Sequence, residues 1–179
     1  MLTLGLVNTY DRIKVLDAHY RSIARAAPIA YSFGFSLALF GFPFNMNAGE
    51  LCRYAADKTT IGESGRYLIE MYEHNRFFVF DMPKKGFQPQ FGVPVVTTSH
   101  PDQKKMITPV KLADEINRGG SYLLLVGLGH KGLPKEMFKR AQLHLDITGM
   151  GVALETCTAI GAVPAVLAVM VKKGNDYGR

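Results

Sequence analysis

The order of segments in this chain of 179 residues predicts an α/β fold, with a parallel sheet covered by helices on both faces. Short apolar runs alternate with segments whose apolar residues recur at helical spacing. The run "SYLLLVG" has no polar alternation after Tyr122, which is typical of a central parallel strand. We see no repeat, linker or low-complexity tract, so we expect one domain over residues 1–179.

Each expected strand is a short apolar run bounded by polar or turn-forming residues. The first, "LTLGLVN", begins almost at the N-terminus, and the last, "LHLDIT", follows a short helical segment. The expected strands are Leu2–Asn8, Ser36–Phe42, Arg76–Asp81, Val93–Thr98, Ser121–Gly127 and Leu143–Thr148. The stretches "MPKKGFQPQFG" and "SHPDQKKM" are rich in turn-forming or polar residues and are expected to be loops.

The helices are predicted from spacing and from their end signals. Pro28 is expected to kink the first helix, and Thr108 is expected to cap a helix that ends before Gly119. Pro134 suits the first turn of a short helix. The expected helices are Val15–Phe33, Asn47–Lys58, Glu63–Asn75, Thr108–Asn117, Pro134–Ala141 and Ala153–Lys172.

Composition narrows the classes of protein that fit the chain. The two cysteines, Cys52 and Cys157, are far apart, which argues against a disulfide framework or a zinc site and favours a reducing cytoplasm. The N-terminus has no signal-peptide pattern. Gly151–Val171 is long enough to span a membrane, but Glu155 and Pro164 favour a buried helix. We therefore expect no membrane partner and no metal, while the net charge of +6 is a weak hint of a nucleic-acid partner.

Three glycines after the central strand have the spacing G-x-G-x-x-G of a dinucleotide-binding turn, and Asp146 follows about twenty residues later. A dinucleotide site needs a long helix after the turn and an acidic residue that ends the next strand. Here Pro134 begins a helix of only about eight residues, and Asp146 lies inside its strand. We therefore expect these glycines to serve either a tight strand-to-helix turn or a different ligand.

Three segments, taken in order, carry a resemblance to one family. The segment "HYRSIARAAPIAYSFGF" resembles the family's first motif, with Arg25 at the motif's Arg position; "LLLVGLGHKGLPKEM" resembles the second. The segment "LHLDITGMGVALETCTAIGAVPAVL" resembles the third, and "VPVVTTSHPDQKK" is similar to a strand ending in Thr beside the cofactor pocket. The family is the SPOUT superfamily of methyltransferases. Most of the chain is covered, except Asn45–Pro89, whose role stays open.

The resemblance implies a deep trefoil knot at the C-terminus, an exception to the usual rules of chain connection. It also implies S-adenosylmethionine as cofactor, a tRNA or rRNA nucleotide as acceptor, and a homodimer that completes the site. The chain looks most like an archaeal branch whose substrates are poorly defined. His19 stands at the Asn position of the first motif, Gly129 replaces an acidic residue, and Glu155 replaces the Asn of SpoU-type members. These departures leave open whether ribose or base is methylated.

A pocket for S-adenosylmethionine needs apolar walls and close backbone groups for the adenine. Because this cofactor has no pyrophosphate, the pocket needs no site for one. Gly127 and Gly129 permit a close approach, and Val126, Ile147 and Leu154 are suitable walls. Threonines are candidates to bond the ribose or the methionine part, although they also suit strand ends and helix caps. The residues expected at the cofactor are Thr97, Thr98, Val126, Gly127, Leu128, Gly129, Gly132, Ile147, Thr148, Leu154 and Thr156.

The resemblance makes Arg25 the main candidate for a catalytic polar residue, in a positioning role because its pKa is too high for a base. In the family this Arg typically comes from the partner subunit. His19, Glu155 and His130 are the candidate bases. Arg25 has a plain alternative as a surface residue of its helix, and His130 has one as a solvated loop histidine. Basic residues that would contact RNA phosphates are Lys84, Lys85, Lys104, Lys105, Lys172 and Lys173.

Two further functions stay open at this point. A knotted protein with the same pocket could bind S-adenosylmethionine or RNA without methyl transfer, and the departures at His19 and Gly129 favour it. A dinucleotide-binding oxidoreductase of the NAD type is the third reading, and only the glycine spacing supports it.

Overall fold

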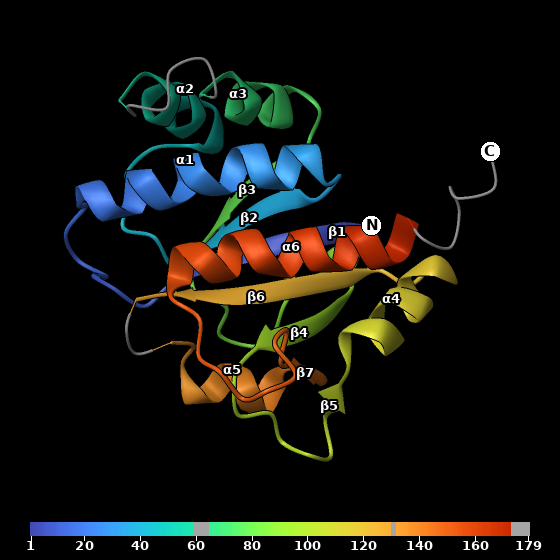
Figure 1. Ribbon diagram of the computed structural model, residues 1–179. Coiled ribbons are helices and arrows are strands. Elements are labelled where there is room, and N and C mark those ends of the chain that lie inside the picture. The colour runs from blue at the N-terminus through green and yellow to red at the C-terminus, as the bar shows by residue number, and fades with distance from the viewer. Residues whose placement is uncertain (59–64, 130–131, 173–179) are drawn as a thin grey trace, which may run out of the picture.

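The computed structural model of the chain describes residues 1–58, 65–129 and 132–172 (Figure 1). These residues form a sheet of seven parallel strands in the order β3-β2-β1-β6-β4-β7-β5. The strands are β1 Leu2–Asn8, β2 Ser36–Phe40, β3 Phe77–Phe80, β4 Val93–Thr97, β5 Met106–Ile107, β6 Tyr122–Leu128 and β7 Leu143–Leu145. The helices are α1 Asp17–Ser32, α2 Ala48–Lys58, α3 Arg66–Glu73, α4 Pro109–Asn117, α5 Lys135–Arg140 and α6 Thr156–Lys172, and a 3₁₀ turn covers Pro89–Phe91.

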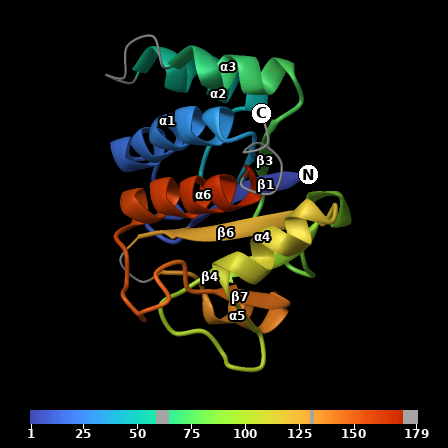
Figure 2. The same cartoon turned by 45° about the vertical axis from the view of Figure 1, so that its right-hand side comes forward.

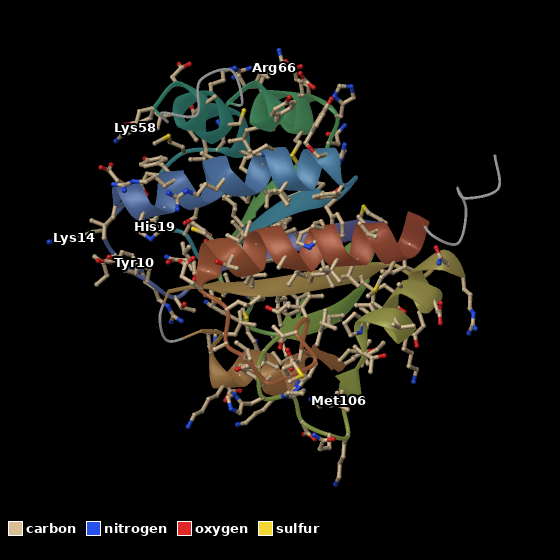
Figure 3. All side chains as sticks on the ribbon, in the orientation of Figure 1. Tyr10, Lys14, His19, Lys58, Arg66 and Met106 are labelled. Atoms are coloured by element: carbon tan, nitrogen blue, oxygen red, sulfur yellow. The ribbon has the colours of Figure 1, made fainter. Side chains whose placement is uncertain are left out.

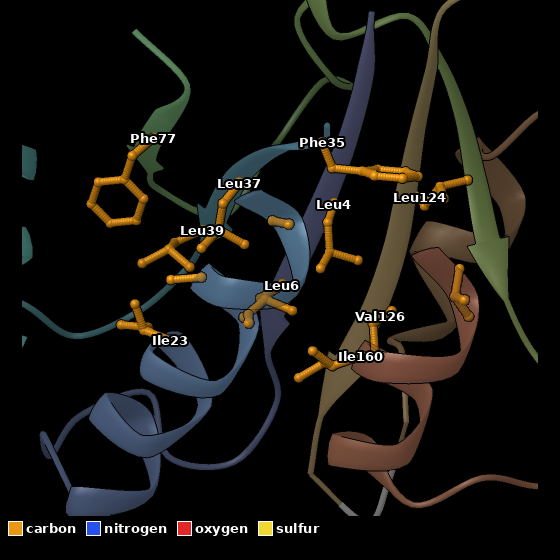
Figure 4. Packing of buried hydrophobic residues seen from close by; sticks show 14 of the residues in the cluster. Leu4, Leu6, Ile23, Phe35, Leu37, Leu39, Phe77, Leu124, Val126 and Ile160 are labelled. Atoms are coloured by element: carbon orange, nitrogen blue, oxygen red, sulfur yellow. The ribbon is translucent and has the colours of Figure 1, made fainter. Parts of the chain in front are cut away.

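Helices cover the two faces of the sheet unequally. On one face, α1, α6 and α4 follow one another across the strands, and α2 and α3 lie beyond α1 (Figure 2). Leu4 and Leu6 of β1 and Val126 of β6 pack there against Ile23 of α1 and Ile160 of α6 (Figure 4). The parallel α/β sheet with helices, expected from the sequence, is therefore confirmed.

The other face is covered by one short helix and by aromatic side chains of a connecting segment. Met137 and Ala141 of α5 pack on it together with Phe87 and Phe91. Strand residues that alternate with those of the first face, such as Leu125 of β6, complete this second cluster. Residues 45–89, which match none of the family's motifs, supply α2, α3, the strand β3 at one edge of the sheet and part of this cover.

The element bounds agree with the sequence patterns to within a few residues, and the differences have local causes. The last strand ends at Leu145, before the expected Thr148, because the Asp146 carboxylate accepts backbone hydrogen bonds and begins a turn. The last helix begins at Thr156, after the expected Ala153. The helix α1 runs through Pro28 without a break, and Thr108 caps α4 by accepting from the Lys111 amide at 3.2 Å. The two-residue strand β5, which begins at the last residue of an expected loop, had no sequence pattern.

The strand β6 lies between β1 and β4, at the point where the order of connections reverses. After β6 the chain forms α5 and β7, and α6 then returns beside the end of β6, where Thr156 Oγ1 donates to the Gly127 carbonyl at 3.2 Å. This return brings the C-terminal third of the chain against the central strand. The trefoil knot itself stays a prediction.

Candidate active site

A cavity of about 910 Å³ lies where the strands β4, β6 and β7 end. The carboxyl ends of strands at such a reversal point are the usual ligand site of an α/β sheet. The expected site residues that line it are Arg25, Thr97, Thr98, Val126, Gly127, Leu128, Gly129, Gly132, Ile147, Leu154, Glu155 and Thr156. Among the described residues, His19 and Thr148 are the expected ones that do not line it, and His130 lies outside the described residues.

The glycine turn after β6 packs against itself. A Cβ atom on Gly127 would lie 2.6 Å from the carbonyl carbon of Gly132 and 2.8 Å from the amide nitrogen of Leu133. Gly129 has φ +135° and Gly132 has φ +63°, which favour glycine. The missing side chain of Gly127 therefore makes room for the returning chain, rather than for a ligand as the sequence had led us to expect.

Two cavity threonines use their hydroxyl protons inside the protein. Thr97 Oγ1 donates to the Leu125 carbonyl at 2.8 Å, and Thr156 Oγ1 donates to the Gly127 carbonyl. A hydroxyl has one proton and two lone pairs. Thr156 Oγ1 also accepts from the Gly129 amide at 3.4 Å, so toward a ligand these hydroxyl oxygens have only acceptor capacity left, which suits ribose hydroxyls or an amino group.

The loop after β7 is organised by Asp146, which lines the cavity. Its Oδ1 accepts from the amide and the hydroxyl of Thr148, at 2.9 and 2.7 Å, and its Oδ2 accepts from the Gly151 amide at 2.7 Å. Burial raises the pKa of Asp146, but the hydrogen bonds from Thr148, Gly151 and Gly149 together lower it below its usual value. Thr148 therefore holds this loop in shape instead of lining the cavity.

One face of α1 forms a second wall of the cavity. Ala18, Arg21, Ser22 and Arg25 line it, and their spacing of three and four residues places them on one side of the helix. Arg25 Nη1 lies 3.0 Å from Sγ of Cys157, in the first turn of α6. The structure thus brings Arg25 to the cavity of its own chain.

Glu155 lies at the start of α6 and is exposed. Its Oε2 accepts from the amides of Cys157 and Thr158, at 2.9 and 3.4 Å. A carboxylate suits a helix N-terminus, where amides lack partners inside the helix and the dipole favours negative charge. One oxygen of this candidate base therefore caps the helix.

His19 is fully buried and lies outside the cavity lining. Its Nδ1 accepts from the Leu16 amide at 3.0 Å, so the ring proton is assigned to Nε2, which lies 3.2 Å from Oδ1 of Asn8. Burial lowers the pKa of His19, and the nearby Asp11 only partly opposes this effect. The side chain fixes the loop before α1 and does not reach a ligand in the cavity.

Several cavity residues had no expected role: Tyr10, Arg21, Ser99, Asp146, Val152 and Cys157. Arg21 had a signal in the sequence, because it precedes Arg25 by one helical turn. Tyr10 had none, since it lies in a loop whose path depends on tertiary contacts. Asp146 had been considered only as the acid of a dinucleotide site.

The expected basic contacts are not equivalent. Lys105 directs its ammonium group into the protein, with Nζ 2.9 Å from each of three carbonyl oxygens at the end of α5, those of Phe138, Lys139 and Ala141. This corrects its expected role on an open surface. Lys84, Lys85 and Lys104 are exposed, whereas the Lys172 side chain and Lys173 lie outside what the structure describes.

Within the described ranges there is no group of three His, Cys, Asp or Glu side chains that could hold a metal ion. The helices of these ranges also include none that is long and apolar enough to cross a membrane.

Solved structures share this fold. A probable methyltransferase from Bordetella pertussis has a TM-score of 0.66 at 13% identity, over 95% of both chains. The A. aeolicus TrmH/SpoU tRNA modifying enzyme has a TM-score of 0.53 at 17% identity, over 99% of this chain and 79% of its own. The SpoU methyltransferase AviRb from Streptomyces viridochromogenes, in complex with AdoMet, has a TM-score of 0.55 at 17% identity, over 99% of this chain and 59% of its own. At these identities the likeness is one of fold.

Sequence relatives are much closer. An uncharacterized protein of Methanocaldococcus jannaschii is 48% identical over 168 residues, which cover 93% of this chain and 92% of the relative. The family described as "Protein of unknown function (DUF531)" matches residues 2–168. The chain therefore belongs to the DUF531 family, and its fold is that of SpoU-type methyltransferases.

Proposed function

We propose that the protein is an S-adenosylmethionine-dependent methyltransferase that acts on a tRNA or rRNA nucleotide. The observation that supports this most is the cavity at the end of β6, which gathers most of the expected residues in a fold shared with a protein solved in complex with AdoMet. Two observations support RNA as the acceptor: a tRNA modifying enzyme has the same fold, and α1 presents a basic face to the cavity.

The chemistry of the cavity fits this cofactor. Val126, Ile147 and Leu154 provide apolar walls for adenine, and the backbone of the turn after β6 provides polar groups beside them. The acceptor oxygens of Thr97 and Thr156 suit ribose hydroxyls. The carboxylates of Asp146 and Glu155 place negative charge in the lining, which favours a cationic sulfonium near them, although Arg21 and Arg25 on α1 balance that charge over the whole cavity.

When bound, S-adenosylmethionine supplies a methyl group that the acceptor takes up by in-line displacement, with loss of a proton from the acceptor. This chain must hold the acceptor in line and receive that proton. Arg25 is suited to positioning, because a guanidinium can bind a phosphate through two parallel hydrogen bonds. Glu155 has one carboxylate oxygen beyond the one that caps α6, and it takes the role of base in this proposal.

Calorimetry separates the main proposal from the oxidoreductase reading. We expect S-adenosylhomocysteine to bind and NAD not to bind; binding of NAD alone would refute the methyltransferase. The short α5, which begins after Pro134, and the closed space at Gly127 both disfavour a pyrophosphate site.

Methyl transfer separates an enzyme from a binding protein. The second function is favoured by the capping role of Glu155, which leaves the base only partly available. With labelled cofactor and bulk RNA, we expect transfer that falls about 100-fold in Arg25→Ala, since mispositioning alone costs about this much. Arg118→Ala, at the exposed end of α4, is the matched control. Cofactor binding without any transfer would favour the binding protein.

The remaining parts of the proposal are a homodimer, a C-terminal trefoil knot and a cytoplasmic location. The outer face of α6 supports the dimer because its residues are small or apolar and half-exposed. The position of β6 between β1 and β4, with α6 returning to its end, supports the knot. An experimental electron-density map traced through residues 127–172 tests whether the chain is threaded.

A further inference from the structure

The loop before α1 and the basic face of that helix both line the cavity. Tyr10 comes from the loop, and Ala18, Arg21, Ser22 and Arg25 come from the helix. We name these five residues the acceptor rim. The other described lining residues are apolar, hydroxyl-bearing or acidic, with Asp146 and Glu155 as the carboxylates, so the cations of the described lining both come from α1.

We propose that the acceptor rim binds an unpaired nucleotide, with its base stacked on Tyr10 and a neighbouring phosphate bound by Arg21. This inference rests on the proposed function and deepens it: the substrate is single-stranded RNA, or a loop whose base is turned out. Figure 3 shows Tyr10 beside Lys14 on this loop, at the end of the molecule where α6 begins.

The loop is held in place by buried polar groups. Asn8, fully buried at the end of β1, donates from Nδ2 to the carbonyl oxygens of Asp11 and Gly41, at 2.6 and 3.0 Å. Its Oδ1 accepts from the Tyr10 amide at 3.1 Å and contacts His19. The backbone of Tyr10 is therefore fixed before any ligand arrives, which reduces the entropy cost of binding.

The far end of the loop is fixed in the same way. Oδ1 of Asp11 accepts from the amides of Ile13 and Lys14, at 2.8 and 2.9 Å, and His19 accepts from the amide of Leu16. The loop therefore holds a defined shape while its side chains point outward: Ile13 is 89% exposed, and Arg12 and Lys14 are also exposed.

Tyr10 combines a fixed backbone with an open ring. Its ring meets His19 edge-on, with centroids 6.1 Å apart and an interplanar angle of 73°, yet the residue is 54% exposed. An aromatic ring that is open to a cavity in a basic surrounding is the arrangement that stacks nucleobases. In a duplex the faces of a base are already stacked, so this contact selects an unpaired nucleotide.

Of the two arginines in the acceptor rim, Arg21 is held more weakly by the rest of the protein than Arg25. Its Nη2 lies 3.8 Å from Oδ2 of Asp17, and the two side chains are 66% and 67% exposed, so this ion pair contributes little and a phosphate can displace it. Arg25, in contrast, contacts Cys157 at 3.0 Å. The two arginines are four residues apart on α1, about one helical turn, which suits one phosphate and the reacting nucleotide.

The test uses the full chain and a labelled single-stranded oligoribonucleotide of twelve residues, with the same strand in a duplex for comparison, by fluorescence anisotropy. We expect the single strand to bind more tightly. Tyr10→Ala should weaken its binding about 5- to 150-fold, the range for the loss of one stacked base. Tyr10→Phe should keep wild-type affinity. Tyr10→Leu, which keeps apolar contact with the loop, should lose affinity as Tyr10→Ala does and covers the case in which the alanine variant does not fold.

Arg21→Gln should weaken binding and reduce the slope of log affinity against log salt by about 0.7, the value for one phosphate contact with a single strand. Tyr54→Ala on α2 and Arg118→Gln on α4 are the matched controls, since both side chains are exposed and lie outside the cavity lining. Both controls should bind RNA as the wild type does.

Binding of S-adenosylhomocysteine, measured on the same proteins, keeps this inference apart from the proposed function. Loss of RNA affinity with unchanged binding of S-adenosylhomocysteine supports the rim. Three outcomes would each overturn nucleotide binding by the acceptor rim, even where S-adenosylhomocysteine binds. They are unchanged RNA binding in Tyr10→Ala and Tyr10→Leu, a preference for the duplex, and no RNA binding by the wild type. Failure of the wild type to bind S-adenosylhomocysteine counts against the proposed function.

Discussion

The residue His19 shows what a single position in a sequence does and does not reveal. Its place in a motif-like segment made it a candidate base, but its partners are the Asn8 side chain, eleven positions earlier, and the Leu16 amide. A sequence pattern does not show whether a histidine points into a cavity or into the core. Burial and two defined partners give His19 a role in holding the acceptor rim.

The pKa of His19 gives a prediction about stability. Since burial lowers its pKa below the ordinary 6.5, the unfolded chain binds a proton that the folded chain does not accept until lower pH. The contribution of neutral His19 to the free energy of unfolding is fully present above about pH 6.5, and it is lost as pH falls from there towards the folded pKa. Urea unfolding between pH 7.5 and 5 should show this loss, and His19→Gln should flatten the curve. His100→Gln, which changes an exposed histidine, should leave the slope unchanged.

Thr3 gives a second prediction at this scale. Its side chain is fully buried on β1, and Oγ1 has no hydrogen-bond partner among the residues that the structure describes. Replacing an unsatisfied buried hydroxyl with a methyl group removes a desolvation cost. Thr3→Val should raise the free energy of unfolding by about 1 kcal/mol. Thr97→Val, which removes a hydroxyl bonded to the Leu125 carbonyl, should lower it, and the opposite order in thermal melting would contradict this account.

At the scale of elements, the sequence predicts best where pattern and burial agree. The strand β6, with its apolar run, and the helix α4, with Thr108 as cap, were placed within one or two residues. The edge strand β5 was missed because its two residues, Met106 and Ile107, pair with β7 only through tertiary contact. The strand β7 ends earlier and the helix α6 begins later than expected, because Asp146 and Glu155 accept hydrogen bonds from nearby amides. The spacing of apolar residues alone does not predict such bonds.

The loop after β7 gives a prediction about an element. In Asp146→Asn, Oδ1 is still able to accept from Thr148, but the new amide group is unable to accept from the Gly151 amide. We expect the free energy of unfolding to fall by about 1–3 kcal/mol and the affinity for S-adenosylhomocysteine to fall with it. Asp102→Asn is the control, because there a single oxygen accepts from the Lys104 amide. Equal effects of the two substitutions would contradict this role of Asp146.

The same loop should respond to acid. Because the folded pKa of Asp146 is lowered, its stabilising contribution is present above the ordinary value of 3.8 and is lost as pH falls through the folded pKa. Affinity for S-adenosylhomocysteine should therefore hold down to pH 3.8 and decline below it, towards the folded pKa, and Asp146→Asn should bind weakly at every pH without this decline. Calorimetry from pH 6 down to about pH 3 checks both curves.

At the scale of the whole molecule, strand order and cavity walls are beyond the reach of local patterns. The cavity joins the segment around Tyr10, the end of β4, the turn after β6 and the loop before α6, which are far apart in sequence. The resemblance to a family brought most of these segments together in advance. It gave no role to Tyr10, which lies outside the matched segments, or to Arg21, which lies inside the first one.

The proposed homodimer gives the last prediction. The sheet side of α6 is buried through Ile160, Val163 and Leu167, whereas Ala165 is half-exposed and Val169 is 53% exposed. A Cβ on Gly161 would meet no atom within 4 Å, so the backbone is open to a second helix there. An apolar helix face of this kind is stabilised by burial against a partner.

Ala165→Arg places a charge in the centre of this face, and we expect a monomer in analytical ultracentrifugation where the wild type is a dimer. Thr158→Arg, at an exposed position near the start of the same helix, tests whether the interface extends to the cavity, since Cys157 lies against Arg25. If the partner subunit completes the site, Ala165→Arg loses methyl transfer together with the dimer while each chain keeps its thermal stability. A monomeric wild type, or a monomeric Ala165→Arg variant with full activity, would show that one chain holds the complete site, with Arg25 acting in its own cavity.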